Sequence, residues 1–263
     1  MKRIILFILS VTLITVQSIA SGDIVLNGVF QGKNLYVMNP FASSGIGFCV
    51  YEVTVNGKVT TDEINSSAFE IDLSVFQFKI GDKVSVTIKH KENCSPKVLN
   101  AEVLKPTSTF SLASINVDND KELKWTTKGE SGSLPFIVEQ YRWNKWIKIG
   151  TVEGKGTPGI NSYSIEIHPH SGNNKFRVKQ IDFSKKPHYS EELTYKAKVP
   201  PVSFSPKKVE TEITFTNPTL FEIYDYYGNI VKKGFSAKID CSGLKKGDYF
   251  LNYDNQMGTF KKK

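Results

Sequence analysis

The amino-acid sequence predicts an all-β protein built from several small domains. Short runs rich in β-branched and aromatic residues alternate with Gly, Pro, Asn and Asp turns at intervals of about ten residues, which is the strand spacing of sandwiches and barrels. Aromatic residues make up 12% of the chain, with 17 Phe and 11 Tyr, and such side chains suit half-buried pleated surfaces. After the N-terminal segment we find no sustained helical repeat. A chain of 263 residues has room for roughly one to three domains.

Residues 1–20 have the pattern of a secretory signal peptide. Lys2 and Arg3 form a positive start, residues 4–16 are mostly apolar, and Ser18 and Ala20 are the small residues that a signal peptidase needs. The alternative is a membrane anchor, but the apolar run is short for spanning a bilayer. No Cys follows the run directly, so we expect no lipid anchor. No later stretch is apolar enough for a membrane helix, so we expect no transmembrane segment after signal cleavage.

The composition favours a globular chain, and the expected export argues against nucleic acid as a partner. Hydrophobic residues make up 40% and charged residues 23%, a balance that does not predict wholesale disorder. The net charge is +8, and without Lys2 and Arg3 the chain has 32 basic and 26 acidic residues, a net charge of +6. Because the chain is expected to be exported, an anionic envelope surface or a polysaccharide fits this charge better than nucleic acid. The alternative is that dispersed Lys residues simply keep the protein soluble.

Residues 21–105 predict an N-terminal β-sandwich. Asn56 and Gly57 accept positive φ at both central positions of a turn, which indicates a hairpin. The loop at 39–47 carries Phe41 and Ile46, so it is either a binding edge or a loop folded over the end of the core. Apolar residues alternate with polar ones at 83–89, which predicts one dry and one wet face. The expected strands are Asp23–Phe30, Asn34–Asn39, Cys49–Val55, Ala68–Leu73, Lys83–His90 and Val98–Leu104.

The three cysteines predict one disulfide and one free thiol. Cys49 and Cys94 lie in the same unit and could pair in an oxidising compartment. Closing that loop would stabilise the fold by roughly 4 kcal/mol in the chain-entropy model. Cys241 lies at an expected strand end and is predicted to be a buried free thiol. There is no Cys-x-x-Cys spacing for zinc or thiol redox chemistry.

Residues 106–199 predict a second sandwich. Trp143, Asn144 and Lys145 form a tight turn between the third and fourth of seven expected strands. Seven short strands in about ninety residues are typical of an immunoglobulin-like domain. The expected strands are Phe110–Ile115, Glu122–Thr127, Pro135–Tyr141, Trp146–Val152, Ser162–Ile167, Lys175–Asp182 and Tyr189–Lys196.

This middle unit resembles a fibronectin type III domain over most of 107–199. The resemblance is carried by the segments 123–127, 136–140, 147–154, 161–164 and 176–183. It is similar in particular to the copies that precede the C-terminal sorting domain of bacterial type IX secretion cargo. The resemblance implies that Trp125 is the core tryptophan of the second strand. Phe176 stands where such domains usually carry Tyr.

Residues 200–263 form a third unit that resembles a type IX sorting domain. Pro200 and Pro201 make a stiff connector before it. The segments 220–225, 226–229 and 230–234 resemble the strand–turn–strand of such domains, and 239–244 with 245–251 match their next hairpin. Residues 259–263 resemble their basic end. Where a Pro-Asn-Pro opening is usual, residues 204–208 hold one proline. The alternative is a related β-domain kept as structure. The resemblance assigns the sorting motif to Gly228, Gly247, Tyr249 and Lys261.

We find no catalytic, cofactor or metal site in the sequence. His168 and His170 flank Pro169 and could approach one ion, but a third ligand is missing and a surface turn is the simpler interpretation. The triplet at 118–120 lacks the rest of an EF-hand loop and is interpreted as a turn. There is no nucleophile elbow, Walker A loop or dinucleotide fingerprint. We therefore expect no cofactor and no enzymatic activity, with a hydrolase as the weakest alternative.

One aromatic cluster is a candidate binding feature, and a second is interpreted as mostly structural. Trp143 in its turn is expected to be partly exposed beside Arg142, where it could stack on a sugar ring or anchor a protein. The alternative is that Trp146 packs in the sandwich and Trp143 caps its end. In the cluster at 224–227 at least one Tyr is expected to face the core. The possible binding residues are therefore Trp143, Arg142 and Phe41.

The sequence thus predicts tandem immunoglobulin-like or fibronectin type III-like sandwiches followed by a small C-terminal β-domain. The expected function is a non-enzymatic binding or structural protein, secreted or in the cell envelope, which the resemblance makes a candidate type IX cargo. Expected partners are an envelope protein or a polysaccharide, and the type IX machinery. The alternatives are a periplasmic accessory of the export machinery and a surface adhesin or glycan-binding module. The expected location is the cell surface or the extracellular space, with the periplasm as the alternative.

Overall fold

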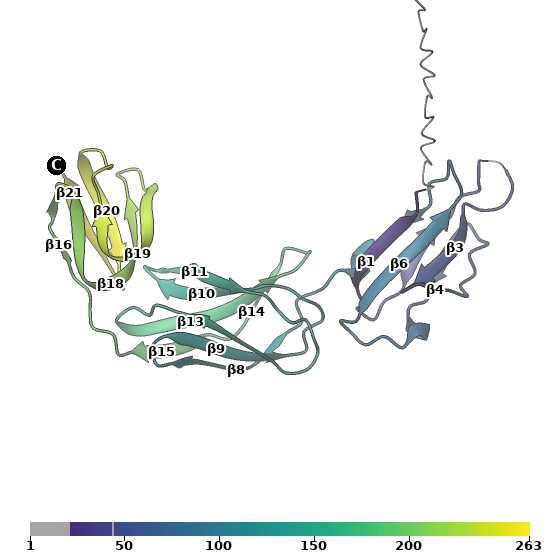
Figure 1. Ribbon diagram of the computed structural model, residues 1–263, viewed down its shortest axis with the longest axis horizontal. Coiled ribbons are helices and arrows are strands. Elements are labelled where there is room, and N and C mark those ends of the chain that lie inside the picture. Colours follow the sequence, from purple (N-terminus) through teal and green to yellow (C-terminus); the bar gives the residue numbers. More distant parts are fainter. Residues whose placement is uncertain (1–21, 44) are drawn as a thin grey trace, which may run out of the picture. The chain divides into compact units, whose positions relative to one another are not determined.

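The computed structural model describes residues 22–43 and 45–263 (Figure 1). The signal peptide predicted at residues 1–20 lies outside the described residues. The described part is built from strands, with two short 3-10 helices at Ser74–Phe76 and Ala101–Leu104. Contacts divide the chain into two compact units, one made mainly of Leu35–Asp72 and Ser85–Asn100, the other of 27–34, 73–84 and Ala101–Lys263. The all-β fold class predicted from the sequence is confirmed, whereas the domain boundaries at residues 105 and 199 stay predictions.

Two antiparallel sheets occupy the N-terminal part of the chain. One has the order β1-β6-β3-β4 (Figure 1). The other has the order β5-β2-β7. Every second side chain of β6 is buried, so the predicted dry and wet faces are confirmed. The strands are β1 Ile24–Val29, β2 Leu35–Met38, β3 Val50–Val55, β4 Lys58–Val59, β5 Ala68–Ile71, β6 Lys83–His90 and β7 Lys97–Val98.

The predicted hairpin is present, and one predicted strand is wrong. Asn56 and Gly57 have φ of 49° and 79° and join β3 to β4. The strand expected at Val98–Leu104 is only the two-residue β7, followed by the 3-10 helix Ala101–Leu104. A 3-10 turn places residues three apart on one side, which turns Leu104 inward and fully buries it. So short a run of mixed apolar and polar residues fits a strand or a 3-10 turn equally well.

The middle sandwich, defined here as β8–β15, has two facing sheets. The first has the order β12-β9-β8. The second has the order β11-β10-β13-β14, with β15 also paired to β13 (Figure 1). Trp125 and Phe176 are fully buried between the sheets, so the core position expected for Trp125 is confirmed. The strands are β8 Ser111–Asp118, β9 Glu122–Lys128, β10 Phe136–Arg142, β11 Lys145–Val152, β12 Asn161–Glu166, β13 Gly172–Ile181, β14 Pro187–Tyr189 and β15 Leu193–Ala197.

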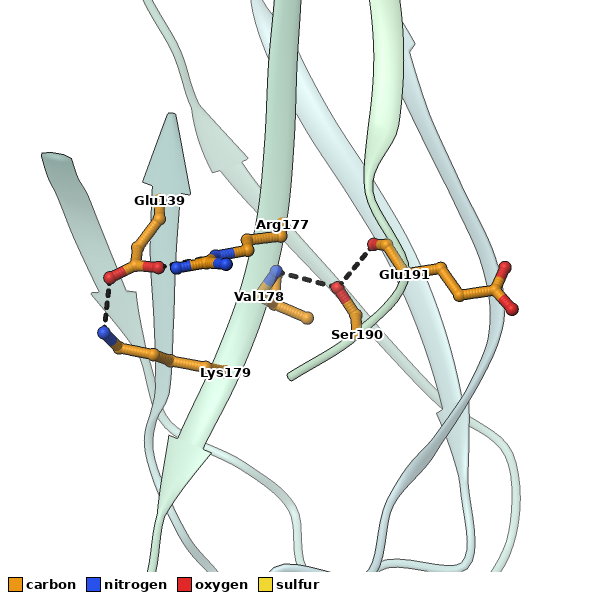
Figure 2. A network of polar contacts seen from close by, with 6 residues as sticks. All are labelled: Glu139, Arg177, Val178, Lys179, Ser190 and Glu191. Atoms are coloured by element: carbon orange, nitrogen blue, oxygen red, sulfur yellow. Dashed lines mark hydrogen bonds and ion pairs between the residues drawn. The ribbon is translucent and has the colours of Figure 1, made fainter. Parts of the chain in front are cut away.

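The last predicted strand of this sandwich is divided in two. Tyr189 of β14 pairs with Lys179, and Leu193 of β15 pairs with Phe176, so both strands lie along the same edge of β13. Between them, the Ser190 hydroxyl accepts a hydrogen bond from Val178 N at 3.0 Å and donates one to Glu191 O at 2.8 Å (Figure 2). A side-chain hydroxyl thus interrupts the backbone ladder, which strand propensity does not reveal.

The tail, defined here as β16–β21, is a separate sheet with its own core. Its order is β16-β18-β20-β21-β17, and β19 pairs with β18. The core contains Phe204, Phe215, Tyr249 and Tyr253 among others. The strands are β16 Phe204–Ser205, β17 Lys208–Val209, β18 Glu212–Tyr224, β19 Ile230–Asp240, β20 Gly247–Tyr253 and β21 Gln256–Lys262.

Two expectations about the tail are wrong. The hairpin expected across residues 239–251 is absent, because β18 pairs with β19 along one edge and with β16 and β20 along the other. Instead β20 forms its hairpin with β21, through a turn at Asp254. Nor does a tyrosine of the 224–227 cluster face the core, since Tyr226 and Tyr227 are 77% and 86% exposed in a hairpin turn and Tyr224 points to a lysine.

Candidate functional site

The candidate site lies where one end of the middle sandwich contacts the tail. The sandwich contributes the tight turn between β10 and β11 and the segment 168–171 before β13. Trp143 and Asn144 have φ of 51° and 60°, so the turn predicted there is confirmed. Paired positive φ values match the twist of the flanking strands. This turn fixes the positions of Arg142 and Trp143, two of the predicted binding residues.

Arg142, proposed from the sequence as a possible binding residue beside Trp143, is buried at the centre of the contact. Its guanidinium donates to Gln140 Oε1 at 2.7 Å, to Asp254 O at 3.1 Å and to His168 O. Burial lowers the pKa of Arg142 to about 10, against the opposing effect of the Asp254 charge. The group therefore stays protonated at neutral pH and joins the sandwich to the tail.

Asp254 presents its carboxylate to the sandwich from the tight turn between β20 and β21. It is 1% exposed and accepts hydrogen bonds from Ser171 N at 2.7 Å, Ser171 Oγ at 2.5 Å and Val202 N at 3.3 Å. Its own amide donates to Thr219 Oγ1 at 3.0 Å. The neighbouring Asn255 donates to Ser171 O at 3.0 Å. A buried carboxylate is tolerable only with such partners, and here donors from both sides supply them.

Three further contacts surround this centre. Lys145 donates to Glu222 Oε2 and to the Tyr224 hydroxyl, each at 2.7 Å. Burial opposes the charge of Lys145, but its hydrogen bonds to Glu222 and Tyr224 raise its pKa. Burial likewise opposes the charge of Glu222, but its hydrogen bonds with Lys145 and Tyr224 lower its pKa. The rings of His168 and Phe235 stack with centroids 3.9 Å apart. The site thus combines ionic, polar and aromatic contacts.

Trp143 is half-buried and faces a groove beside the contact. Its indole Nε1 donates to Tyr253 O at 3.4 Å. The groove has a volume of about 390 Å³, with Trp143, Ile147 and Phe221 among its apolar lining and Glu166 and Lys233 among its charged lining. A half-buried indole at the edge of a groove is available for contact with a ligand ring.

The prediction that His168 and His170 form a surface turn is wrong for His170, which is buried, whereas His168 stacks on Phe235 of the tail. The Nδ1 atom of His170 lies 2.7 Å from Ser171 O, and burial lowers the pKa of its imidazole. In residues 22–43 and 45–263, no group of three or more His, Cys, Asp or Glu side chains is arranged to hold a metal ion. The triplet at 118–120 is a turn, with φ of 49° at Asn119 and 57° at Asp120.

Sequence reasoning missed a second feature, a stack of cations and aromatic rings on the outer face of β10, β11, β13 and β14. The Arg177 guanidinium lies 4.0 Å from the Trp146 ring centroid and 4.1 Å from that of Tyr189. Glu139 accepts from Arg177 Nε at 2.8 Å and from Lys179 (Figure 2). Trp146 therefore packs against Arg177 on the outer face rather than within the core. No signal for this stack is present in the sequence alone, because it depends on the strand register that places Glu139 opposite Arg177.

Phe41 lies on the exposed loop that the sequence singled out. Its side chain is 65% exposed, and its ring stacks on that of Phe48 at a centroid distance of 4.4 Å. Ile46 in the same loop is 78% exposed. The loop therefore presents apolar side chains rather than burying them over the core, and a binding role for Phe41 stays a prediction.

Cys49 and Cys94 form the disulfide that the sequence favoured, with their Cα atoms 5.6 Å apart. Cys49 is buried directly before β3. Cys241 is buried and free, as predicted, and burial raises the pKa of its thiol.

The four residues assigned to the sorting motif take structural positions in the tail. Gly228 has φ of 83° in the hairpin turn between β18 and β19, a conformation that disfavours any other residue. Gly247 begins β20. Tyr249 is buried against Phe260, with ring centroids 5.3 Å apart, whereas Lys261 is exposed on β21. Of these residues, only Lys261 offers a side chain to an external partner.

Comparison with known proteins supports the identity of the tail. Residues 205–263 match the family model of the secretion system C-terminal sorting domain. The matched range coincides with the tail, which follows the middle sandwich in the chain. No curated protein matches the chain. Within the described residues there is no helix with the length and apolar character that a bilayer crossing requires.

Several solved structures are similar to the chain at low identity. A tetra-tandem repeat from the extending region of a large adhesion protein is 13% identical, covers 92% of this chain and 73% of that one, and has a TM-score of 0.32. The fibronectin(III)-like modules of Clostridium thermocellum CbhA are 13% identical over 59% of this chain and 93% of theirs, with a TM-score of 0.22. Dimeric latent PorU from Porphyromonas gingivalis is 12% identical over 92% of this chain and 30% of its own, with a TM-score of 0.26. With TM-scores this low, these likenesses add nothing to the argument from geometry.

Proposed function

We propose that this protein is a non-enzymatic cargo of a type IX secretion system. After export it serves as a binding or structural protein at the cell surface or outside the cell. The match of residues 205–263 to the C-terminal sorting domain carries the proposal. The N-terminal pattern of a secretory signal peptide supports it, because that pattern directs a chain into the export pathway. The partners would be the secretion machinery during export and an envelope protein or polysaccharide afterwards.

The location of the full chain tests this proposal. Antibodies against the chain would follow it in periplasm, membrane and medium fractions of its native cell, with and without a working type IX system. We expect surface or medium localisation in the competent cell and periplasmic accumulation in the deficient one. Periplasmic localisation in both cells would instead identify a resident accessory of the export machinery.

A second candidate function is glycan binding in the groove beside Trp143. The groove favours a neutral glycan, because its lining balances Lys148 and Lys233 against Glu166 and Glu222 and places an indole at the edge. Trp143→Ala is expected to abolish retention on polysaccharide columns, whereas Trp146→Ala, which removes a tryptophan outside the groove, is expected to leave it intact. Equal retention of the wild type and Trp143→Ala would exclude this function.

A further inference from the structure

We infer that the end of the middle sandwich is a docking surface for the tail, and that the two stay bound as a complex after the connector between them is cut. The tail is then a bound partner of its own chain rather than a freely swinging appendage. The inference goes beyond the proposed function and holds whether or not the chain is exported.

The first reason is that the polar groups of the two sides complete each other. Asp254 is almost fully buried, and two of its hydrogen bonds come from Ser171, on the sandwich. Arg142 is 2% exposed and donates to the backbone carbonyl of Asp254. Separating the two sides would leave these groups without the partners that they now have. Charged groups buried in this way stabilise an interface because hydrogen bonds from the other side replace the water that they have lost.

The second reason is that the contact extends well beyond the Asp254 turn. Lys145 of the sandwich forms an ion pair with Glu222 of the tail, and the Lys145 ammonium lies 5.4 Å from the centroid of the Tyr224 ring. His168 of the sandwich stacks on Phe235 of the tail. A buried polar centre with aromatic and ionic contacts around it is the anatomy of a specific protein interface.

The third reason is that the connector itself is held at both ends. Lys198 N donates to Asp120 Oδ2 at 3.2 Å on the sandwich. Val202 packs in the tail core and donates its amide to Asp254. Pro200 and Pro201 lie exposed between these anchors. The connector can therefore be opened at the two prolines without removing any contact that holds the tail in place.

A site-specific cut in the full chain tests the inference. A protease recognition sequence inserted between Pro200 and Pro201 would be cleaved in the folded protein, and the products separated by size-exclusion chromatography at micromolar concentration. We expect the two fragments to elute together from the wild-type background. Separate elution of two folded fragments would overturn the inference.

Point variants then test whether the Asp254 centre carries the affinity. Asp254→Ala is expected to weaken association of the cut fragments about 30-fold or more, since it leaves buried donors unpaired. Asp248→Ala is the matched control, because Asp248 is exposed on β20 of the same hairpin, and we expect it to change nothing. If Asp254→Ala fails to fold, Ser171→Ala removes one hydrogen bond from the sandwich side, with an expected loss of about tenfold. Unchanged affinity in a folded Asp254→Ala or Ser171→Ala protein would contradict the proposed docking surface.

The docked tail also restricts how another protein can recognise it. Asp254 is buried in the contact, whereas Lys261 on β21 is exposed. A receptor that binds the docked chain must therefore use the exposed strands and turns of the tail, or else displace the tail from the sandwich.

Discussion

Removing the disulfide should destabilise the N-terminal sandwich by about 4 kcal/mol. Cys49 and Cys94 are separated by 45 residues, and the chain-entropy model assigns about this free energy to a loop of that length. The three tryptophans of the chain are Trp125, Trp143 and Trp146, all in the middle sandwich, so tryptophan fluorescence does not report on this unit. Amide hydrogen exchange of β3 and β6 does report on it. We expect exchange of their most protected amides to accelerate about a thousandfold in the Cys49→Ala/Cys94→Ala double variant.

Two controls separate the loop effect from the loss of sulfur. Cys241→Ala removes a buried thiol that closes no loop, and we expect the exchange of β3 and β6 to be unchanged in it. Reduction of the wild-type disulfide should reproduce the double variant without any change of sequence. An acceleration below about tenfold in the double variant would refute the reasoning. It would show that the cross-link lowers the entropy of the unfolded state much less than the chain-entropy model requires.

Three further predictions concern the second unit. Gly156→Ala should lower the unfolding free energy by roughly 2 kcal/mol or more, measured by urea titration of tryptophan fluorescence, because Gly156 has φ of 71° and an added Cβ would come within 2.2 Å of Ser133 N. Thermal stability should fall as the pH drops below about 6.5, since burial lowers the pKa of His170 and the unfolded state takes up the proton first; a smaller fall is expected in His170→Gln, and an identical fall would contradict this assignment. Cys241 should resist a thiol reagent in the native protein and react once unfolded, and fast native labelling would show that it is accessible.

The parts of the fold that depend on neighbouring residues could be predicted from the sequence. Asn56 and Gly57 specify a turn through their tolerance of positive φ, and the turn is present. The alternation around Val84 and Val86 specifies the buried face of β6, and that face is buried. The resemblance placed Trp125 in the core, where it lies. In each case the deciding interaction lies within a few residues or within a known pattern.

The parts that depend on distant partners could not be predicted in this way. The burial of Arg142 depends on Asp254, which is 112 residues further along the chain. The pairing of β20 depends on which edge of β18 is left free by β19. In the middle sandwich, the last predicted strand is divided in two by a hydrogen bond from Val178 N to the Ser190 hydroxyl. Charged and polar residues usually lie on the surface, and these residues form a buried interface only through contacts with distant parts of the chain. The sequence therefore placed Trp143 in its turn but did not reveal that Arg142 is buried.

The measurement that tests the central claim most directly is the location and intact mass of the mature protein in its native cell. The proposed function predicts a chain at the surface or in the medium whose mass shows loss of residues from about Pro201 onward, with residues 21–199 as the working part. A full-length chain ending at Lys263 in the periplasm would contradict it and would assign the sorting domain to a resident structural or docking role.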